Sequence, residues 1–311
     1  MTIVITNCTN RKRGVAHPSL NQSNISPGSL EFVLNQWVDS LKNDHDLKLA
    51  SDIYCGRGFR EAEATSRILN CPLYIVSAGL GVINSNSSVP IYNLTASTKQ
   101  EESVLRKIQD GSTAIQWWSN ISGASPFGTS LQRVMSDHPD DLILIALPAT
   151  YFELIKDDLL RCPYIQQPRL RFFGKNLDSI LPNSLKRNWM PYDDRLDGIG
   201  VGHSGTQSDF AQRAMRHFAL TVLDQCREGS ANTHSDLVID SISPIGRRPI
   251  PKRDRLNDLE IGKAVSANWI KGKGQSSLLL RIIRDDLNIA CEQKRFTRIL
   301  NSVKQKIGGA I

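Results

Sequence analysis

Short runs of apolar and β-branched residues alternate along this chain with longer segments of helical spacing. Four runs have the composition of buried strands: Thr2–Asn7 (TIVITN), Pro72–Ser77 (PLYIVS), Asp141–Leu147 (DLILIAL) and Leu170–Gly174 (LRFFG). Apolar residues recur at helical intervals between them, for example over Leu30–Leu41 and Phe59–Leu69. This alternation predicts an α/β fold with a mostly parallel sheet that carries helices on both faces.

The first strand run ends in a polar and basic loop, Asn7 to Gly14 (NCTNRKRG). Parallel sheets bind ligands beyond the carboxyl ends of their strands, so this loop is expected at the ligand edge. Its backbone N–H groups and side chains suit a phosphate or a polar base edge. The candidate ligand-binding residues are Asn7, Thr9, Arg11 and Lys12.

Cys8 lies within the same loop, next to these cations. Nearby positive charge favours the thiolate, which makes Cys8 a candidate nucleophile. The alternative is a small buried hydrophobic residue, which is the common role of a free cysteine.

Two further turns follow predicted strands or precede predicted helices. In the segment Tyr54 to Gly58 (YCGRG), two glycines before a helix let the backbone approach a ligand closely. In the segment Ser77 to Gly81 (SAGLG), small residues follow a buried strand, and an aromatic and an amide come shortly after it. The alternative for each segment is an ordinary tight turn. The candidate ligand-binding residues are Tyr54, Gly56, Arg57, Ser77, Gly79, Tyr92 and Asn93.

The segment Asn188–Phe210 (NWMPYDDRLDGIGVGHSGTQSDF) is rich in acids and glycines. A loop of this length in a compact domain is often functional, and its acids and histidine are suited to proton transfer. The alternative is a solvated surface lid. The candidate catalytic residues here are Asp193, Asp194 and His203. No cofactor or metal spacing is evident, although the acids could hold a divalent ion from solution.

Positive charge is concentrated at the C-terminal end. From Ile245 to Ile311 there are 15 Lys and Arg residues against 6 Asp and Glu residues, whereas the rest of the chain has 23 and 25. A basic segment beside a near-neutral body indicates contact with a polyanion. We therefore expect an α/β domain at 1–228, a linker or basic arm at 229–255 and a basic helical module at 256–311.

The helical module is expected to form three short helices, over Leu256–Trp269, Ser276–Leu287 and Ile289–Ile307. Short helices with external cations resemble a helix-turn-helix or winged-helix unit, so DNA is the expected partner. The alternative is a basic helical cap on the main domain. The candidate DNA-binding residues are Arg247, Arg248, Lys252, Arg253, Lys271, Lys273, Arg281, Arg284 and Arg295.

Cysteine usage and hydropathy indicate the compartment. The six cysteines form no CxxC pair, which argues against a zinc ribbon and a disulfide scaffold. No apolar run reaches the roughly 18 residues of a membrane helix. The N-terminal sequence also lacks the order of a signal peptide. We therefore expect a cytoplasmic protein with reduced thiols and no membrane partner.

Four segments in order resemble the YaaA-related family of Rossmann-like proteins. They are the polar loop after the first strand, then YCGRGF, LYIVSAGLGVI and PIYNLT. The matching positions are Tyr54, Gly56, Phe59, Ser77, Ala78, Gly81, Pro90 and Tyr92, within roughly the first 95 residues. The resemblance implies a nucleobase or nucleotide site at the sheet edge and a context of DNA modification or phage defence. It does not cover the acidic loop or the basic end, so it implies no reaction type.

Three functions fit these patterns. The first is an enzyme that flips a base out of DNA and modifies it, for example through attack of Cys8 on a nitrile-bearing 7-deazaguanine. The second is a DNA-binding subunit or regulator of a defence complex without chemistry. The third is a hydrolase or transferase of free nucleotides. We expect the first, with possible protein partners in a modification or restriction complex.

Overall fold

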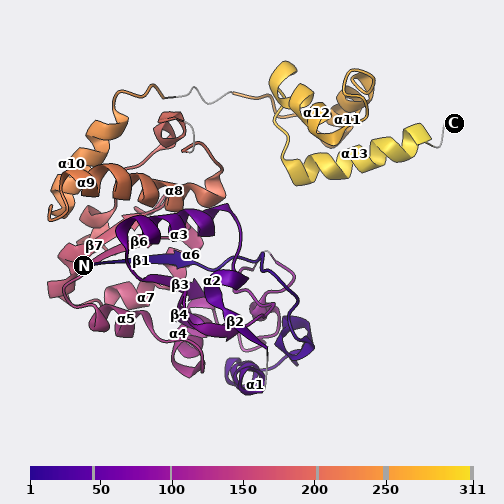
Figure 1. Ribbon diagram of the computed structural model, residues 1–311. Helices are drawn as coiled ribbons and strands as arrows, with labels where there is room; N and C mark the ends of the chain where they lie inside the picture. Colours follow the sequence, from indigo (N-terminus) through magenta and orange to yellow (C-terminus); the bar gives the residue numbers. More distant parts are fainter. Residues whose placement is uncertain (44–45, 99, 201–202, 248–251, 309–311) are drawn as a thin grey trace. The chain divides into compact units, whose positions relative to one another are not determined.

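Figure 1 shows the computed structural model, which describes residues 1–43, 46–98, 100–200, 203–247 and 252–308. The chain divides into two compact units, Met1–Arg247 (unit 1) and Arg248–Ile311 (unit 2). Arg248 lies outside the described residues. No helix within the described ranges is both long and apolar enough to span a bilayer.

A five-stranded sheet lies at the centre of unit 1, with the strand order β4-β3-β1-β6-β7. Strands β1, β3, β6 and β7 run parallel, and β4 is antiparallel to β3. The bounds are β1 Thr2–Asn7, β3 Leu73–Ser77, β4 Gly81–Asn84, β6 Leu142–Ala146 and β7 Leu170–Phe173. The prediction of an α/β fold with a mostly parallel sheet is therefore confirmed. Because β3 and β6 flank β1 on opposite sides, the winding reverses at β1, which is where such sheets bind ligands.

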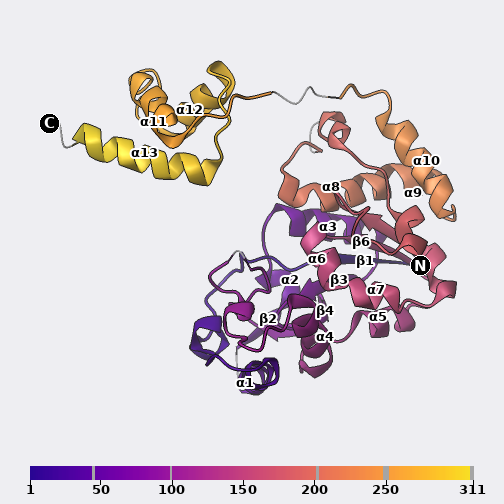
Figure 2. The same ribbon diagram turned by 180° about the vertical axis from the view of Figure 1, so that it is seen from behind.

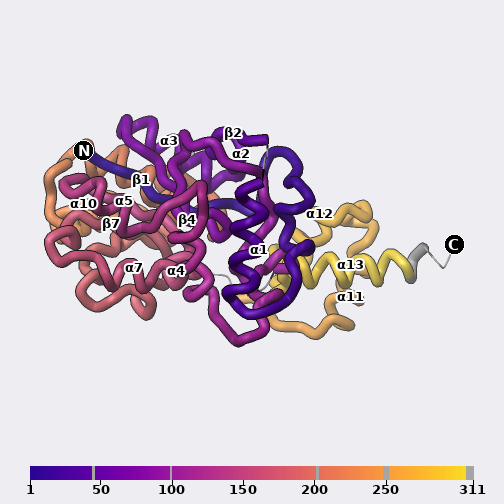
Figure 3. The backbone as a smooth tube through the Cα atoms, turned by 90° about the horizontal axis from the view of Figure 1, so that it is seen from below, coloured from indigo at the N-terminus to yellow at the C-terminus, as the bar shows by residue number. Residues whose placement is uncertain are grey.

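Helices cover both faces of the sheet. Helices α3 (Arg57–Leu69) and α8 (Phe210–His217) pack together and contact β1, β6 and β7. Helix α4 (Ala114–Ala124) packs against β4 and against α1 (Leu30–Lys42) on the other face. Figures 1 and 2 show these two layers from opposite sides, and Figure 3 shows the α1 and α4 layer from below.

Shorter elements complete unit 1. A second, two-stranded sheet pairs β2 (Leu47–Leu49) with β5 (Ser88–Pro90). The remaining helices are α2 Ala50–Ile53, α5 Leu131–Asp137, α6 Ala149–Leu154, α7 Lys156–Leu160, α9 Leu223–Gln225 and α10 Ala231–Ile242. A π-helical turn, Phe218–Val222, joins α8 to α9.

Helix α10 corrects the expected linker at 229–255. It begins at an N-capping serine, Ser230, and belongs to unit 1. Its His234 is fully buried and accepts a hydrogen bond on Nδ1 from Arg171 Nε at 2.9 Å. The polar composition of this segment therefore reflects an amphipathic surface helix.

The sheet supplies much of the core of unit 1. Ile3 and Ile5 of β1 and Leu144 of β6 are fully buried, as expected for strands covered on both faces. Two buried indoles fix the turn after β3: Trp37 donates to the Gly79 carbonyl and Trp117 donates to the Ala78 carbonyl, each at 2.7 Å. The carboxyl edge of β3 is thus held rigidly.

Unit 2 has its own apolar cluster, which includes Ile261, Val265, Leu279, Phe296 and Leu300. Its helices are α11 (Asp258–Ala267), α12 (Ser276–Arg281), which continues into a π-helical turn at Ile282–Asp286, and α13 (Gln293–Gly308).

Candidate functional site

The loop after β1 folds back onto the segment before α3. The Cys8 N–H donates to the Val76 carbonyl at 2.9 Å, which places Cys8 beside the end of β3. Lys12 forms an isolated antiparallel bridge with Tyr54, and Arg13 N–H donates to the Ile53 carbonyl at 2.8 Å. Three segments far apart in sequence therefore meet at the carboxyl edge of β1 and β3.

A chain of hydroxyl groups lies at this edge. Ser77 Oγ is 2.6 Å from the Tyr92 hydroxyl, which is 3.1 Å from the Tyr54 hydroxyl. All three side chains are buried, and burial raises the pKa of both tyrosines. The phenols therefore stay protonated at neutral pH and can pass a proton along the chain. A side chain at Gly79 would collide with the Tyr92 ring, since a Cβ there would lie 2.8 Å from a ring carbon.

The Lys12 ammonium lies over these rings, with Nζ 4.2 Å from the Tyr92 centroid and 5.9 Å from the Tyr54 centroid. Burial lowers the pKa of Lys12, while the nearby Cys8 and Cys55 thiols act in the opposite direction. Cys8 and Cys55 are thus the side chains that act electrostatically on this amine. An amine with a lowered pKa can accept a proton from a neighbouring thiol.

Cys8 is 5% exposed, and its Sγ lies 3.1 Å from the hydroxyl of Tyr151 in α6. Burial also raises the pKa of Tyr151, so its hydroxyl stays protonated next to the sulfur. Lys12 also interacts electrostatically with Cys8. We call Cys8, Lys12, Tyr54, Ser77, Tyr92 and Tyr151 the Cys8 cluster.

The N-terminus of α3 borders the Cys8 cluster. Its N-cap is Gly56, which has a φ of 118° and makes no side-chain capping bond. A Cβ at Gly56 would lie 3.9 Å from the Thr9 side chain, so the loop after β1 approaches the helix start. The first N–H groups of a helix attract anions, which makes this end suitable for a phosphate.

Gln212 of α8 joins α3 to the end of β1. Its Nε2 donates to Thr6 Oγ1 at 3.1 Å, to Asn7 Oδ1 at 2.9 Å and to the Ala146 carbonyl at 3.1 Å. Asn7 therefore positions the loop and also donates to the Cys8 carbonyl at 2.7 Å. The Gln212 Oε1 is buried beside Gly58 and has no hydrogen-bond partner among the described residues.

The other ligand-binding candidates near the loop take different positions. Thr9 Oγ1 donates to the Arg11 carbonyl at 2.7 Å, while the Arg11 side chain is exposed. The side chain of Asn93 is also exposed, and its backbone pairs with Leu20 and Gln22. The expectation that Asn93 lines the site is therefore wrong, because β-type pairing turns its amide away from the Tyr92 ring.

The space beside the Cys8 cluster is small. A cavity of about 60 Å³ adjoins Tyr151 and is lined by Thr95, Ala96 and Ser97. This volume corresponds to about two water molecules. The Asn10 amide donates to Gln100 Oε1 and so ties the loop after β1 to the segment that follows this cavity wall.

The acidic loop Asn188–Phe210 is held by one buried arginine. Arg213 of α8 is 2% exposed, and it donates to Asp209 and Asp197 at 2.7 Å each and to the Thr206 carbonyl at 3.1 Å. Arg57 reaches the same loop through the Ser204 carbonyl and pairs with Asp209 at 3.7 Å. The described parts of the loop, residues 188–200 and 203–210, are therefore pinned beside the start of α3, while residues 201 and 202 lie outside the described residues.

Asp193 and Asp194 do not join the Cys8 cluster. Asp193 pairs with Arg195 at 3.0 Å and with Arg247 at 3.4 Å, and Asp194 pairs with Lys175. Although burial alone would raise it, hydrogen bonds from Arg195 lower the pKa of the Asp193 carboxyl. These ion pairs hold both carboxylates against protein cations, and their expected role in proton transfer stays a prediction.

His203 stacks edge-on against His217, with ring centroids 5.4 Å apart. Burial lowers the pKa of His203, and the nearby Arg216 guanidinium lowers it further. His217 is 4% exposed, and its Nδ1 is 2.9 Å from the Tyr192 hydroxyl. His203 thus belongs to a buried aromatic contact apart from the Cys8 cluster, which does not match the catalytic role expected of it.

The His217 contact predicts acid sensitivity. Burial lowers the pKa of His217 to about 4, whereas an unfolded histidine titrates near 6.5. Between these two values the unfolded chain binds more protons, so stability falls as the pH drops through this window, by about 3 kcal/mol in total. Urea unfolding at about pH 7 and about pH 4.5 measures this loss. His217→Gln should reduce the pH dependence, and an identical dependence in both proteins would refute the assignment.

Several candidate DNA-binding side chains of unit 2 form ion pairs or hydrogen bonds with other residues of the same unit. Arg253 pairs with Asp285 at 2.9 Å, Lys271 with Asp286 at 2.6 Å and Arg295 with Asp258 at 2.6 Å. Arg284 Nε donates to the Cys291 carbonyl at 2.8 Å. The ion pairs of Arg253, Lys271 and Arg295 do not follow from local sequence, because the acids lie 32, 15 and 37 positions away.

Other cations of unit 2 remain exposed and make no ion pair among the residues the structure describes. These are Lys252, Arg255, Lys263, Lys273, Arg281, Lys294 and Lys304. Lys252, Lys273 and Arg281 are thus the expected DNA-binding residues that stay available, while the exposed Arg247 at the end of unit 1 also contacts Asp193.

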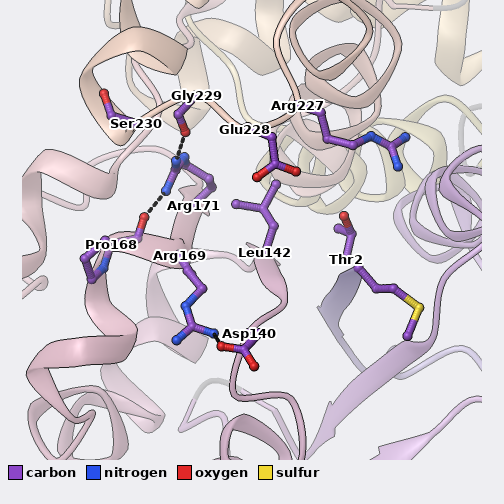
Figure 4. Close-up of a pocket in the computed structure, with 11 residues that line it drawn as sticks. Thr2, Asp140, Leu142, Pro168, Arg169, Arg171, Arg227, Glu228, Gly229 and Ser230 are labelled. Carbon is purple, nitrogen blue, oxygen red and sulfur yellow. Dashed lines mark hydrogen bonds and ion pairs between the residues drawn. The ribbon is translucent and has the colours of Figure 1, made fainter.

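A second cavity, of about 590 Å³, lies at the opposite edge of the sheet, where β1, β6 and β7 begin (Figure 4). Arg171 on its wall is 1% exposed and donates to the Pro168 and Gly229 carbonyls at 2.7 and 2.8 Å. Arg169 pairs with Asp140 at 3.5 Å. Arg169 and Arg171 thus hold protein groups, and none of the expected site residues lines the cavity.

A metal site or a known relative could each point to a function. No group of three His, Cys, Asp or Glu side chains in the described ranges could hold a metal ion. Comparisons with family models, with curated proteins and with solved structures found no match. The functional argument therefore depends on the geometry of the chain itself.

Sequence reasoning missed Tyr151 and Gln212. Tyr151 follows β6 by five positions, so the rule that selected the loops after β1 and β3 also applies to it. Gln212 lies in a helix with no local signal of its contact with β1. It could be found only from the packing of α8.

Proposed function

We propose that this protein modifies a nucleobase in DNA, with the Cys8 cluster as its chemical centre and unit 2 as its DNA-binding part. The supporting observation is a thiol in contact with a phenol and in electrostatic interaction with a lysine amine, at the carboxyl edge of a parallel sheet. The uncapped start of α3 beside it offers a place for a phosphate.

Cys8, Lys12 and Tyr151 have defined roles in this proposal. The Cys8 proton passes to the Lys12 amine, and the sulfur attacks an electrophilic carbon of the base, such as a nitrile carbon. As the S–C bond forms, one electron pair of the C–N multiple bond moves to nitrogen, which takes a proton from Lys12. The Tyr151 hydroxyl donates to the sulfur before attack.

Unit 2 is proposed to hold the duplex as a helix-turn-helix or winged-helix-like module. Its exposed cations suit phosphates, which position a protein on DNA without specifying sequence. The resemblance of the segments around Tyr54, Ser77 and Tyr92 to the YaaA-related family supports the same assignment, and we propose membership in that family.

The modification itself can be tested in cells. DNA from cells with and without the gene is digested to nucleosides and compared by mass spectrometry. A nucleoside that appears or disappears with the gene supports the proposal. Identical profiles contradict base modification and favour a DNA-binding protein without chemistry.

The DNA contact predicts a steep salt dependence. If about four cations contact phosphates, affinity for a duplex should fall about 10²-fold between about 50 and 200 mM salt, because bound counterions are released. Fluorescence anisotropy of the full chain with a labelled mixed-sequence duplex measures this slope. Absent or salt-independent binding would instead favour an enzyme of free nucleotides.

A further inference from the structure

Helix α13 has an outward face that its packing leaves open to solvent. It is 16 residues long, and Phe296, Ile299, Leu300 and Val303 face the core of unit 2. Opposite them lie four exposed residues, Lys294, Arg298, Asn301 and Gln305. Their intervals of four, three and four residues place them in one row along the helix. We call this row the α13 ridge.

We propose that the α13 ridge enters the major groove of duplex DNA and contacts base edges there, an inference that rests on the DNA-binding role proposed for unit 2. The residue types support this. Arginine and lysine bond to guanine O6 and N7, and asparagine and glutamine bond to adenine N6 and N7. The α13 ridge contains only these four types.

The positive charge of α13 also favours binding to a polyanion. Residues 293–305 contain four Lys and Arg residues and no Asp or Glu residue. The acid that reaches the helix is Asp258 of α11, which pairs with Arg298 at 3.0 Å and with Arg295. Arg298 is still 74% exposed, so the pair holds its guanidinium outward at the surface.

The shape of α13 favours duplex DNA over duplex RNA. A major groove about 12 Å wide admits an α-helix, whereas the major groove of RNA is too deep and narrow. A helix of 16 residues is about 24 Å long and presents all four ridge residues along one side.

A selection experiment tests the proposal. The full chain is incubated with a randomised duplex pool of about two helical turns, and the bound fraction is sequenced. The wild type should enrich a sequence subset. The double variant Asn301→Ala, Gln305→Ala should bind the unselected pool almost as well but lose enrichment by about tenfold or more at each contacted base.

Matched variants separate base reading from phosphate contact. Lys273→Ala and Arg281→Ala should weaken binding to all sequences without changing the preferred one, because phosphate contacts carry no sequence information. Ser302→Ala, an exposed residue beside the α13 ridge, should change neither property. Alanine favours the helix, so none of the α13 variants removes the element under test.

The failures are distinguishable. If the wild type binds no duplex, the DNA-binding part of the proposed function is wrong, and this inference falls with it. If the wild type enriches a sequence and the double variant enriches it equally, only this inference is wrong. Stronger binding to duplex RNA or single strands than to duplex DNA would also overturn it.

Discussion

Replacing Cys8 with alanine should reduce DNA modification by on the order of 10³-fold or more, because it removes the proposed nucleophile. In the proposed mechanism, the Tyr151 hydroxyl donates a hydrogen bond to the Cys8 sulfur and the Lys12 amine accepts the proton of the thiol. The readout is the amount of the gene-dependent nucleoside in cellular DNA at equal protein level. Lys12→Met should cause a smaller loss, about 10²-fold, since it removes a proton acceptor and leaves the thiol.

Cys55 provides a matched control for Cys8. It is a half-buried thiol in the neighbouring segment, and its Sγ donates to the Arg11 carbonyl at 3.2 Å. Cys55→Ala should keep most of the activity. If Cys8→Ala retains activity as Cys55→Ala does, the thiol is a packing residue and the proposed chemistry is wrong.

Replacing Arg213 with methionine should destabilise unit 1 by about 3–5 kcal/mol. Asp209 is 3% exposed, and the loss of Arg213 leaves it with a 3.7 Å ion pair to Arg57 and with hydrogen bonds from the Thr206 N–H and hydroxyl at 2.9 and 3.1 Å. A buried carboxylate that loses its cationic partner destabilises the folded state. The substitution also removes the hydrogen bonds from Arg213 to Asp197 and to the Thr206 carbonyl, which hold the acidic loop.

Urea unfolding followed by tryptophan fluorescence measures this loss, because Trp37, Trp117 and Trp118 are buried in unit 1. Arg57→Met is the matched control. Arg57 is 40% exposed and its pairs are long, so its replacement should cost less than about 1 kcal/mol. Equal effects of the two variants would show that Arg213 does not anchor the loop.

The sheet and part of the site could be predicted because both follow from local patterns. β-branched runs predict strands, and parallel strands bring their carboxyl ends to one edge. That rule alone places Cys8 and Ser77 near each other. The same rule places Tyr54 and Tyr92 at this edge of the sheet. The hydrogen bond between their hydroxyl groups depends on side-chain rotamers, which no sequence pattern specifies.

The remaining features depend on long-range packing. Arg213 and Gln212 act on segments at both ends of unit 1, and a helical pattern shows only that α8 is amphipathic. The same limit applies to charge. Arg253 and Asp285 are adjacent in space and 32 positions apart in sequence, so counting cations overestimates those available to DNA. Helix α10 was mistaken for a linker because its polar face dominates its composition.

Protection of Cys8 by a bound nucleotide tests the central claim most directly. The full chain is treated with iodoacetamide alone, with the four deoxynucleoside monophosphates and with a mixed-sequence duplex, and alkylation is quantified by peptide mass spectrometry. Cys226, which lies outside the Cys8 cluster at the end of α9, serves as the internal control. We predict that nucleotide or duplex lowers alkylation at Cys8 and leaves Cys226 unchanged. Equal alkylation of Cys8 in all three samples would contradict a nucleobase site at this edge of the sheet.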